Sequence, residues 1–196
     1  MTRVTVRNKT RVLCWVPSLE KWLPDRVKAV NETWLRRCDG HLFFVETKGN
    51  HSADVISLGI SDGRRHLAEK SMAAFTYLYH HHLHDRFDWF LKGDDDTFVV
   101  VENLRYLLEQ YNASQPVYLG HLFKVLVKGG YMSGGASYVL SREALRILNE
   151  EGFQKVCKLT MPYSQACVLS LHHSFLQHDV LFSELKYCFV SCVIIQ

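Results

Sequence analysis

Three adjoining carboxylates, Asp94, Asp95 and Asp96, stand between the apolar runs 89–92 and 98–100, which are both typical of buried β-strands. Like charges repel, and a carboxylate at the edge of a core needs solvent or a cation, so stability alone does not explain the triplet. A divalent ion such as Mg²⁺ or Mn²⁺ binds carboxylate oxygens and keeps coordination positions open for phosphate. The pattern therefore predicts a metal–diphosphate site at a strand end.

A solvated acidic turn is the ordinary alternative for three acids, and the strand-like flanks weigh against it. Two other acidic motifs are excluded. A calcium loop of the EF-hand type that starts at Asp94 would need glycine and glutamate where Val99 and Arg105 stand. A phosphatase motif of the form Asp-x-Asp-x-Thr would need threonine in place of Phe98.

A second stretch, residues 129–141, reads Gly-Gly-Tyr-Met-Ser-Gly-Gly-Ala-Ser-Tyr-Val-Leu-Ser. The adjacent Gly134 and Gly135 allow the backbone to approach a ligand closely. Tyr131 and Tyr138 are able to stack on a sugar ring or to hydrogen-bond its hydroxyls. A glycine-containing hairpin with buried aromatic rings is the alternative for this stretch.

The spacing of apolar residues predicts alternating strands and helices along the chain. Strands are expected at residues 11–16, 41–45, 54–58, 89–92, 117–120 and 122–127. Helices are expected at residues 24–38, 64–83, 102–111 and 142–151, the last capped by Ser141. The inner face of the second helix is expected to contain Leu67, Ser71, Ala74, Phe75 and Leu78. A β-α-β beginning predicts a parallel sheet, and the acidic triplet then lies at a carboxyl edge, where open α/β sheets bind ligands.

The composition is that of a globular domain, with 196 residues of which 47% are hydrophobic and 22% charged. The net charge of +3 contains no basic block, so nucleic acid is not an expected partner. No run of 18 apolar residues predicts a membrane span, and residues 1–11 lack the apolar core of a signal peptide.

Four of the six asparagines nevertheless lie in Asn-x-Ser/Thr sequons, namely Asn8, Asn31, Asn50 and Asn112. We therefore expect a secretory-pathway lineage in which the N-terminus, with its anchor, is incomplete or alternative. Among the six cysteines, the spacing of Cys14 and Cys38 is compatible with a disulfide, while free buried thiols are the alternative.

Taken together, residues 92–99 and 130–141 closely resemble the glycoprotein core 1 β1,3-galactosyltransferases, and the resemblance extends over residues 11–157. It implies a Rossmann-like GT-A fold, an α/β architecture in which helices flank a mixed, mostly parallel sheet. It also implies a type II Golgi membrane enzyme that tends to form homodimers. Such enzymes transfer galactose from UDP-galactose to the 3-hydroxyl of N-acetylgalactosamine on Ser or Thr of glycoproteins, with inversion, and use Mn²⁺.

The resemblance also implies roles for individual residues. Asp94 and Asp96 match the acids that grip the ion on the UDP diphosphate, and Asp95 is available to the nucleotide ribose or the metal shell. Lys70 matches a basic residue expected near the donor.

On the sugar side, Tyr131 and the Gly134-Gly135 turn match the region that shapes the acceptor and donor sugars.

The chain departs from the family pattern after Cys157, so residues 11–157 are predicted as the GT-A-type domain and residues 158–196 as an atypical tail. The expected catalytic base and third metal ligand have no clear counterpart there. The tail histidines are possible ligands, although exposed tail residues are the more ordinary interpretation; they are His172, His173 and His178. Gly93 also replaces the usual alanine before the triplet. Two alternatives remain. The chain is a catalytically inactive relative that acts as a chaperone or partner, or it is a truncated product without function.

Overall fold

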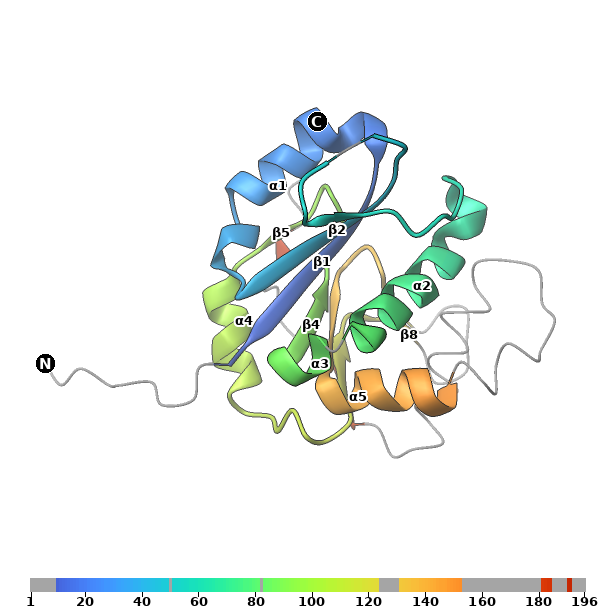
Figure 1. The fold of residues 1–196 in the computed structure, drawn as a ribbon. Helices are drawn as coiled ribbons and strands as arrows, with labels where there is room; N and C mark the ends of the chain where they lie inside the picture. Colours follow the sequence, from blue (N-terminus) through green and yellow to red (C-terminus); the bar gives the residue numbers. More distant parts are fainter. Residues whose placement is uncertain are drawn as a thin grey trace, which may run out of the picture.

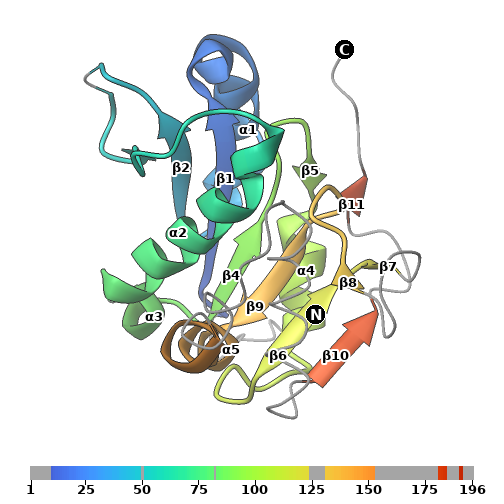
Figure 2. The same ribbon diagram turned by 90° about the vertical axis from the view of Figure 1, so that its right-hand side faces the viewer.

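The computed structural model describes residues 10–49, 51–81, 83–123, 131–152, 181–184 and 190–191. A seven-stranded sheet forms its centre, with helices on both faces (Figure 1). The strands of this sheet are β1 (Val12–Leu19), β2 (Gly40–Glu46), β3 (Val55–Ile56), β4 (Trp89–Lys92), β6 (Val117–Gly120), β9 (Tyr138–Ser141) and β10 (Leu181–Glu184). Their order is β10-β6-β9-β4-β1-β2-β3, which Figure 2 shows from β2 across to β10.

Only β9 runs against its neighbours within this sheet, because it pairs antiparallel with both β4 and β6, while the remaining pairs are parallel. This confirms the predicted mixed, mostly parallel α/β sheet. Two short antiparallel pairs accompany it: β5 (Phe98–Val99) with β11 (Val190–Ser191), and β7 (Leu122–Phe123) with β8 (Tyr131–Met132).

The helices divide between the two faces of the sheet. α1 (Lys28–Glu32) and α4 (Val101–Leu108) cover one face, and α2 (Leu67–His80), α3 (Leu83–Arg86) and α5 (Arg142–Ile147) cover the other (Figure 1). Shorter 3-10 and π-helical turns are η1 (Glu20–Trp22), η2 (Leu23–Val27), η3 (Leu35–Arg37), η4 (Arg64–His66) and η5 (Leu148–Gly152). In the part of the chain that the structure describes, no helix is long and apolar enough to cross a membrane.

The first strand shows why the sheet is buried on both faces. Val12, Cys14 and Val16 belong to the apolar cluster under α1 and α4, whereas Leu13 and Trp15 belong to the cluster under α2 and α5. Successive side chains of a strand point to opposite faces, so a strand covered on both sides is a continuous apolar run in the sequence.

The helix predicted over residues 24–38 is interrupted. Pro24 lies in η2, α1 has only five residues, and Thr33 leaves the helical region with φ −106° and ψ −97°. The Thr33 hydroxyl donates to the carbonyl of Ala29, a side-chain bond that competes with helix continuation. The predicted apolar face is nevertheless buried through Val27, Val30 and Trp34.

In α2, the predicted burial of Ala74, Phe75 and Leu78 is confirmed, but the expectation for Leu67 is wrong because its side chain is 51% exposed. Leu67 is the first residue of α2, and the buried position in that first turn is taken by Lys70 instead.

Part of the predicted tail enters the sheets, since β10 extends the parallel pairing at β6 and β11 pairs with β5. Residues 153–180, 185–189 and 192–196 lie outside the described residues, and the domain boundary at residue 157 stays a prediction.

Asp88 lies at the amino ends of the central strands β1 and β4, where its carboxylate accepts hydrogen bonds from the Arg11 guanidinium at 2.9 and 3.0 Å and from Arg142 at 3.4 Å. Burial raises the pKa of Asp88, but the hydrogen bonds of Arg11 and the charges of both arginines outweigh it, so the pKa lies below its ordinary value. The Arg142 amide also donates to the Asp88 carbonyl. This cluster joins the starts of β1, β4 and α5.

A disulfide joins Cys14 in the middle of β1 to Cys38 just after η3, with the two Cα atoms 6.2 Å apart. Of the two possibilities left open by the spacing, the disulfide is therefore the one found. It ties the interrupted helical segment to the central strand.

We expect reduction of this disulfide to lower the free energy of unfolding by about 3 kcal/mol, because the bridge closes a loop of 24 residues in the unfolded chain. Urea unfolding with and without reductant measures the loss, and the Cys38→Ser variant should be as unstable without reductant as the reduced wild type. A wild-type chain whose stability is unchanged after thiol titration has confirmed reduction would contradict the prediction.

Candidate functional site

The acidic triplet lies where β4 ends. Lys92 is the last residue of β4, opposite Trp15 of β1, and the amide of Gly93 still donates to the Trp15 carbonyl at 3.0 Å. The chain then turns: the Thr97 amide donates to the Asp94 carbonyl at 3.1 Å. The triplet is thus at the carboxyl edge of the parallel strands β1, β2 and β4, as the sequence predicts.

Trp34 packs against this turn and forms a hydrogen bond with it. Its indole N–H donates to the Thr97 carbonyl at 2.8 Å, and a Cβ atom at Gly93 would lie 2.9 Å from its ring. Because a Cβ atom does not come that close to a ring, an alanine at position 93 would require Trp34 to move. Glycine before the triplet is therefore matched to the position of Trp34 in this chain.

All three carboxylates of the triplet lie next to a basic side chain, and Asp95 and Asp96 share the same one. Asp94 binds the ammonium group of Lys92. Asp95 accepts from the Ser18 hydroxyl and lies 3.3 Å from the Arg26 guanidinium, which is also 3.8 Å from Asp96. The side chain of Asp95 is 13% exposed, whereas those of Asp94 and Asp96 are 31% and 45% exposed, so the two outer acids face solvent more than the middle one.

Lys92 connects the triplet to the second predicted motif. Its side chain is 9% exposed, and its Nζ donates to the Gly134 carbonyl at 3.1 Å as well as to Asp94. A Cβ atom at Gly134 would lie 3.6 Å from this Nζ, and one at Gly135 would lie 3.9 Å from Asp94 Oδ2. Two stretches 40 residues apart therefore meet around one buried ammonium group.

The backbone of Tyr131 lies at the same carboxyl edge of the sheet. It begins β8 and pairs with Phe123 of β7, the strand that follows the carboxyl end of β6. β6 and β4 are parallel to each other because both are antiparallel to β9. Tyr138, considered as a sugar-stacking residue, is instead buried in the core against Tyr118 and Phe75.

Lys70 is held differently from the other predicted residues. It is buried in α2 and pairs with Asp62, and among the described residues no ion pair joins it to the triplet. Its role near the donor stays a prediction. The tail histidines considered as metal ligands, at positions 172, 173 and 178, lie outside the described residues.

Sequence reasoning missed Ser18, Arg26 and Trp22. Arg26 lies over the Trp22 ring at 4.2 Å from its centre, and Lys21 lies over the same ring at 4.7 Å. The available signal was positional, since polar residues that follow the first strand of a parallel sheet reach its carboxyl edge. The particular pairing of Arg26 with the triplet is a long-range contact that local spacing does not contain.

The donor set suits a divalent cation that is shared with a diphosphate. Within the described ranges, no three His, Cys, Asp or Glu side chains are grouped as a complete ligand set. Mg²⁺-type ions in phosphate-transfer sites commonly use only one or two carboxylates and take their remaining ligands from substrate phosphates and water. Asp94 and Asp96, both partly exposed, fit that arrangement.

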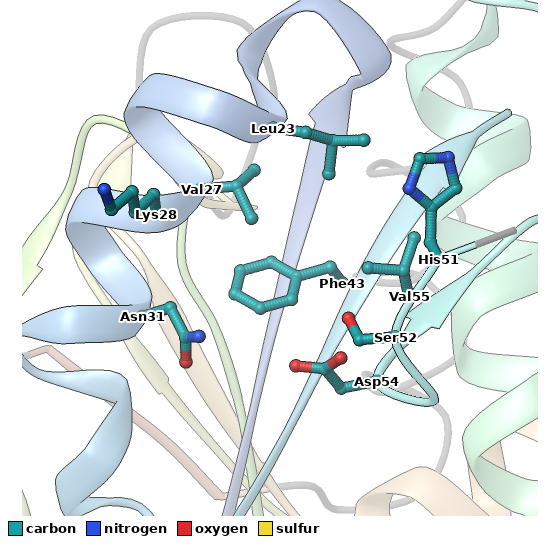
Figure 3. Close-up of a pocket in the computed structure, with 9 residues that line it drawn as sticks. All are labelled: Leu23, Val27, Lys28, Asn31, Phe43, His51, Ser52, Asp54 and Val55. Atoms are coloured by element: carbon teal, nitrogen blue, oxygen red, sulfur yellow. The ribbon is translucent and has the colours of Figure 1, made fainter. Parts of the chain in front are cut away.

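A separate cavity of about 290 Å³ lies between α1 and the segment before β3. Figure 3 shows Phe43 at its centre, with Val27 and Leu23 on one side and Val55 on the other. None of the predicted site residues lines it, so it is distinct from the candidate site.

Ser137 is under backbone strain beside the Gly134-Gly135 turn. Its φ is +63°, it is 1% exposed, and no described residue forms a hydrogen bond with its hydroxyl. A non-glycine residue in the left-handed region is strained, and an unpaired buried hydroxyl adds to the cost.

The fold is of the GT-A type found in glycosyltransferases. A crystal structure of a glycosyltransferase involved in glycosylation of the major capsid of PBCV-1 has the same fold, with a TM-score of 0.51 and 15% identity over 88% of this chain and 80% of that one. A Fringe-like sequence profile matches residues 8–164, and the chain belongs to the Fringe-like family.

The chain is also similar in sequence to two characterised glycosyltransferases. The chain is 44% identical over 154 residues to the Xenopus laevis glycoprotein-N-acetylgalactosamine 3-beta-galactosyltransferase 1. The aligned region covers 78% of this chain and 42% of the frog protein. It is 31% identical over 144 residues to the Mus musculus beta-1,3-glucosyltransferase, covering 72% of this chain and 29% of that relative. The chain thus spans less than half the length of these relatives.

Replacing Ser137 by glycine should stabilise the protein by about 1 kcal/mol, because relief of the left-handed strain and of the unpaired hydroxyl exceeds the backbone entropy cost of glycine. Urea unfolding of the variant measures the change. Ser133→Gly is the matched control, since Ser133 has no positive φ and glycine there should destabilise. A Ser137→Gly variant that loses stability like the control would contradict the account of strain.

Proposed function

We propose that this chain is the donor-binding part of an inverting β1,3-galactosyltransferase. In this proposal galactose moves from UDP-galactose to the 3-hydroxyl of N-acetylgalactosamine on Ser or Thr of glycoproteins. The observation that carries the proposal is the meeting of Asp94 with the Gly134-Gly135 turn around buried Lys92, at the carboxyl edge of the sheet. The 44% identity to the frog galactosyltransferase supports the choice of sugar and acceptor.

In this mechanism Asp94 and Asp96 would hold a divalent cation, expected to be Mn²⁺, that binds the UDP diphosphate. When bound, the cation neutralises the charge that grows on the diphosphate as the sugar–phosphate bond breaks. The protein's own contribution is orientation: Lys92 fixes Asp94, while Ser18 fixes Asp95, which is available to the ribose or the metal shell.

Arg26 adds a cation at the solvent side of the same cluster. Its guanidinium spans Asp95 and Asp96 and is supported by the face of Trp22. A guanidinium is well suited to phosphate oxygens. We infer that Arg26 leaves Asp96 for the diphosphate when the nucleotide binds, so that the same residue balances the carboxylates without ligand and the phosphates with it.

The Gly134-Gly135 turn and Tyr131 are assigned to the sugars. A side chain at position 135 would approach Asp94, so the glycine pair keeps the space beside the proposed diphosphate site open. Inversion follows if the acceptor hydroxyl and the diphosphate lie on opposite sides of the anomeric carbon of galactose.

The proposed location is the Golgi lumen, with the chain as the lumenal part of a type II membrane protein that forms a homodimer. The Cys14–Cys38 disulfide supports an oxidising compartment. Anchor and dimer contacts are proposals drawn from the resemblance.

The direct test is transfer of labelled galactose from UDP-galactose to a GalNAc-Thr peptide in the presence of Mn²⁺. Asp94→Asn and Asp96→Asn should each lower transfer by a factor of about 100 or more, because each weakens binding of the cation that neutralises the leaving diphosphate. Asp25→Asn, a change of an exposed carboxylate next to Arg26, is the matched control and should keep the wild-type rate. Wild-type rates in Asp94→Asn and Asp96→Asn as well as in the control would show that the triplet takes no part in the reaction.

Substitution of Arg26 by alanine should change two affinities in opposite directions. Mn²⁺ alone should bind more tightly, because a competing cation is removed, while UDP in the presence of Mn²⁺ should bind about tenfold more weakly, because a charged hydrogen bond is lost. Calorimetric titration measures both, and Arg26→Lys should lie between the variant and the wild type. A variant in which both affinities fall, or neither changes, would contradict the exchange of partners.

A further inference from the structure

Two of the four sequons of the chain lie in the part that the structure describes. Asn8 and Asn50 lie outside the described residues, whereas Asn31 and Asn112 lie within them. Asn112 is exposed in the connection between α4 and β6, and Asn31 is partly buried on α1. These two positions therefore allow a comparison of one loop sequon with one helical sequon.

The sequon at Asn112 has the geometry of an Asx turn. Its side-chain Oδ1 accepts a hydrogen bond from the Ser114 amide at 2.9 Å, and its main-chain carbonyl accepts one from the Gln115 amide at 2.9 Å. This turn occupies the amide oxygen of the side chain. Among the described residues none accepts a hydrogen bond from Asn112 Nδ2, so the nitrogen is available at the surface.

The connection also lies at the end of the sheet opposite the acidic triplet. The triplet follows the carboxyl end of β4, while Asn112 precedes the amino end of β6, a strand parallel to β4. Ser114 is bound there by Arg142, which belongs to the Asp88 cluster at the starts of β1 and β4. In Figure 1 this connection runs along the lower edge of the molecule, below α4. A large substituent on Asn112 leaves the proposed donor site open.

Asn31 is presented less favourably. It lines the cavity beside Phe43, as Figure 3 shows. A glycan at this position would leave from the wall of a cavity instead of from an open turn.

We propose that Asn112 carries an N-linked glycan. In this reaction Asn112 Nδ2 forms a bond to the anomeric carbon of an oligosaccharide carried on a lipid diphosphate. The bond from that carbon to the phosphate oxygen breaks, the lipid diphosphate leaves, and one Nδ2 proton passes to the base of the membrane oligosaccharyltransferase. This inference depends on the proposed passage through the secretory pathway.

The test expresses the chain behind a secretion leader in eukaryotic cells, in a variant with Asn8→Gln, Asn31→Gln and Asn50→Gln. Asn112 is then the one sequon that remains in the sequence. Treatment with a glycosidase that releases N-linked glycans should lower the apparent mass of the secreted variant on a gel by the mass of one glycan. Adding Ser114→Ala should abolish the shift, and Ser114→Thr in its place should retain it.

Peptide mass mapping of the secreted wild-type chain provides a second measurement that does not depend on the triple variant being secreted. Enzymatic release converts a glycosylated asparagine to aspartate, so residue 112 should be recovered as aspartate. Recovery as unmodified asparagine from secreted, folded protein would overturn the proposal. The readout is independent of galactose transfer: a glycosylated but inactive chain would contradict the proposed function alone.

Discussion

The arrangement of the candidate site depends on one buried ammonium group. Lys92 is 7% exposed, and a buried lysine is costly unless its charge is paired and its donors are satisfied. Asp94 supplies the charge and the Gly134 carbonyl supplies a further acceptor. Because both partners are loop residues, satisfying Lys92 fixes two loops at once. The acid that would hold a cation and the turn that would face the sugar thus have a common anchor at the end of β4.

The sheet explains why these two loops meet. β9 lies beside β4 in antiparallel register, with Lys92 opposite Tyr138, so the segment that enters β9 arrives where β4 ends. On the other side, the parallel pairing with β1 brings Ser18 and the η2 turn with Arg26 to the same edge. Strand order, more than local sequence, therefore converts separate polar residues into one site. Trp34 completes it by supporting the triplet turn through Thr97.

Those parts of the fold that depend on local patterns could be predicted from the sequence. The apolar run of β1, the periodic face of α2 after its first turn and the Ser141 cap, which accepts from the Ala144 amide, are all local signals. Leu67 was predicted wrongly because periodicity shows which face of a helix is apolar but not where along the helix its burial begins. The pairing of Lys92 with Gly134 and of Arg26 with Asp95 joins residues 42 and 69 positions apart, and such contacts follow from topology, which spacing does not contain.

The central claim is that the cluster around Lys92 is a metal–diphosphate site, and calorimetric titration of UDP into the wild-type chain tests it most directly. The account predicts binding in the presence of Mn²⁺ and a large loss of affinity when the ion is removed by a chelator. A folded chain that binds UDP equally well with and without Mn²⁺, or that does not bind it at all, would contradict the account.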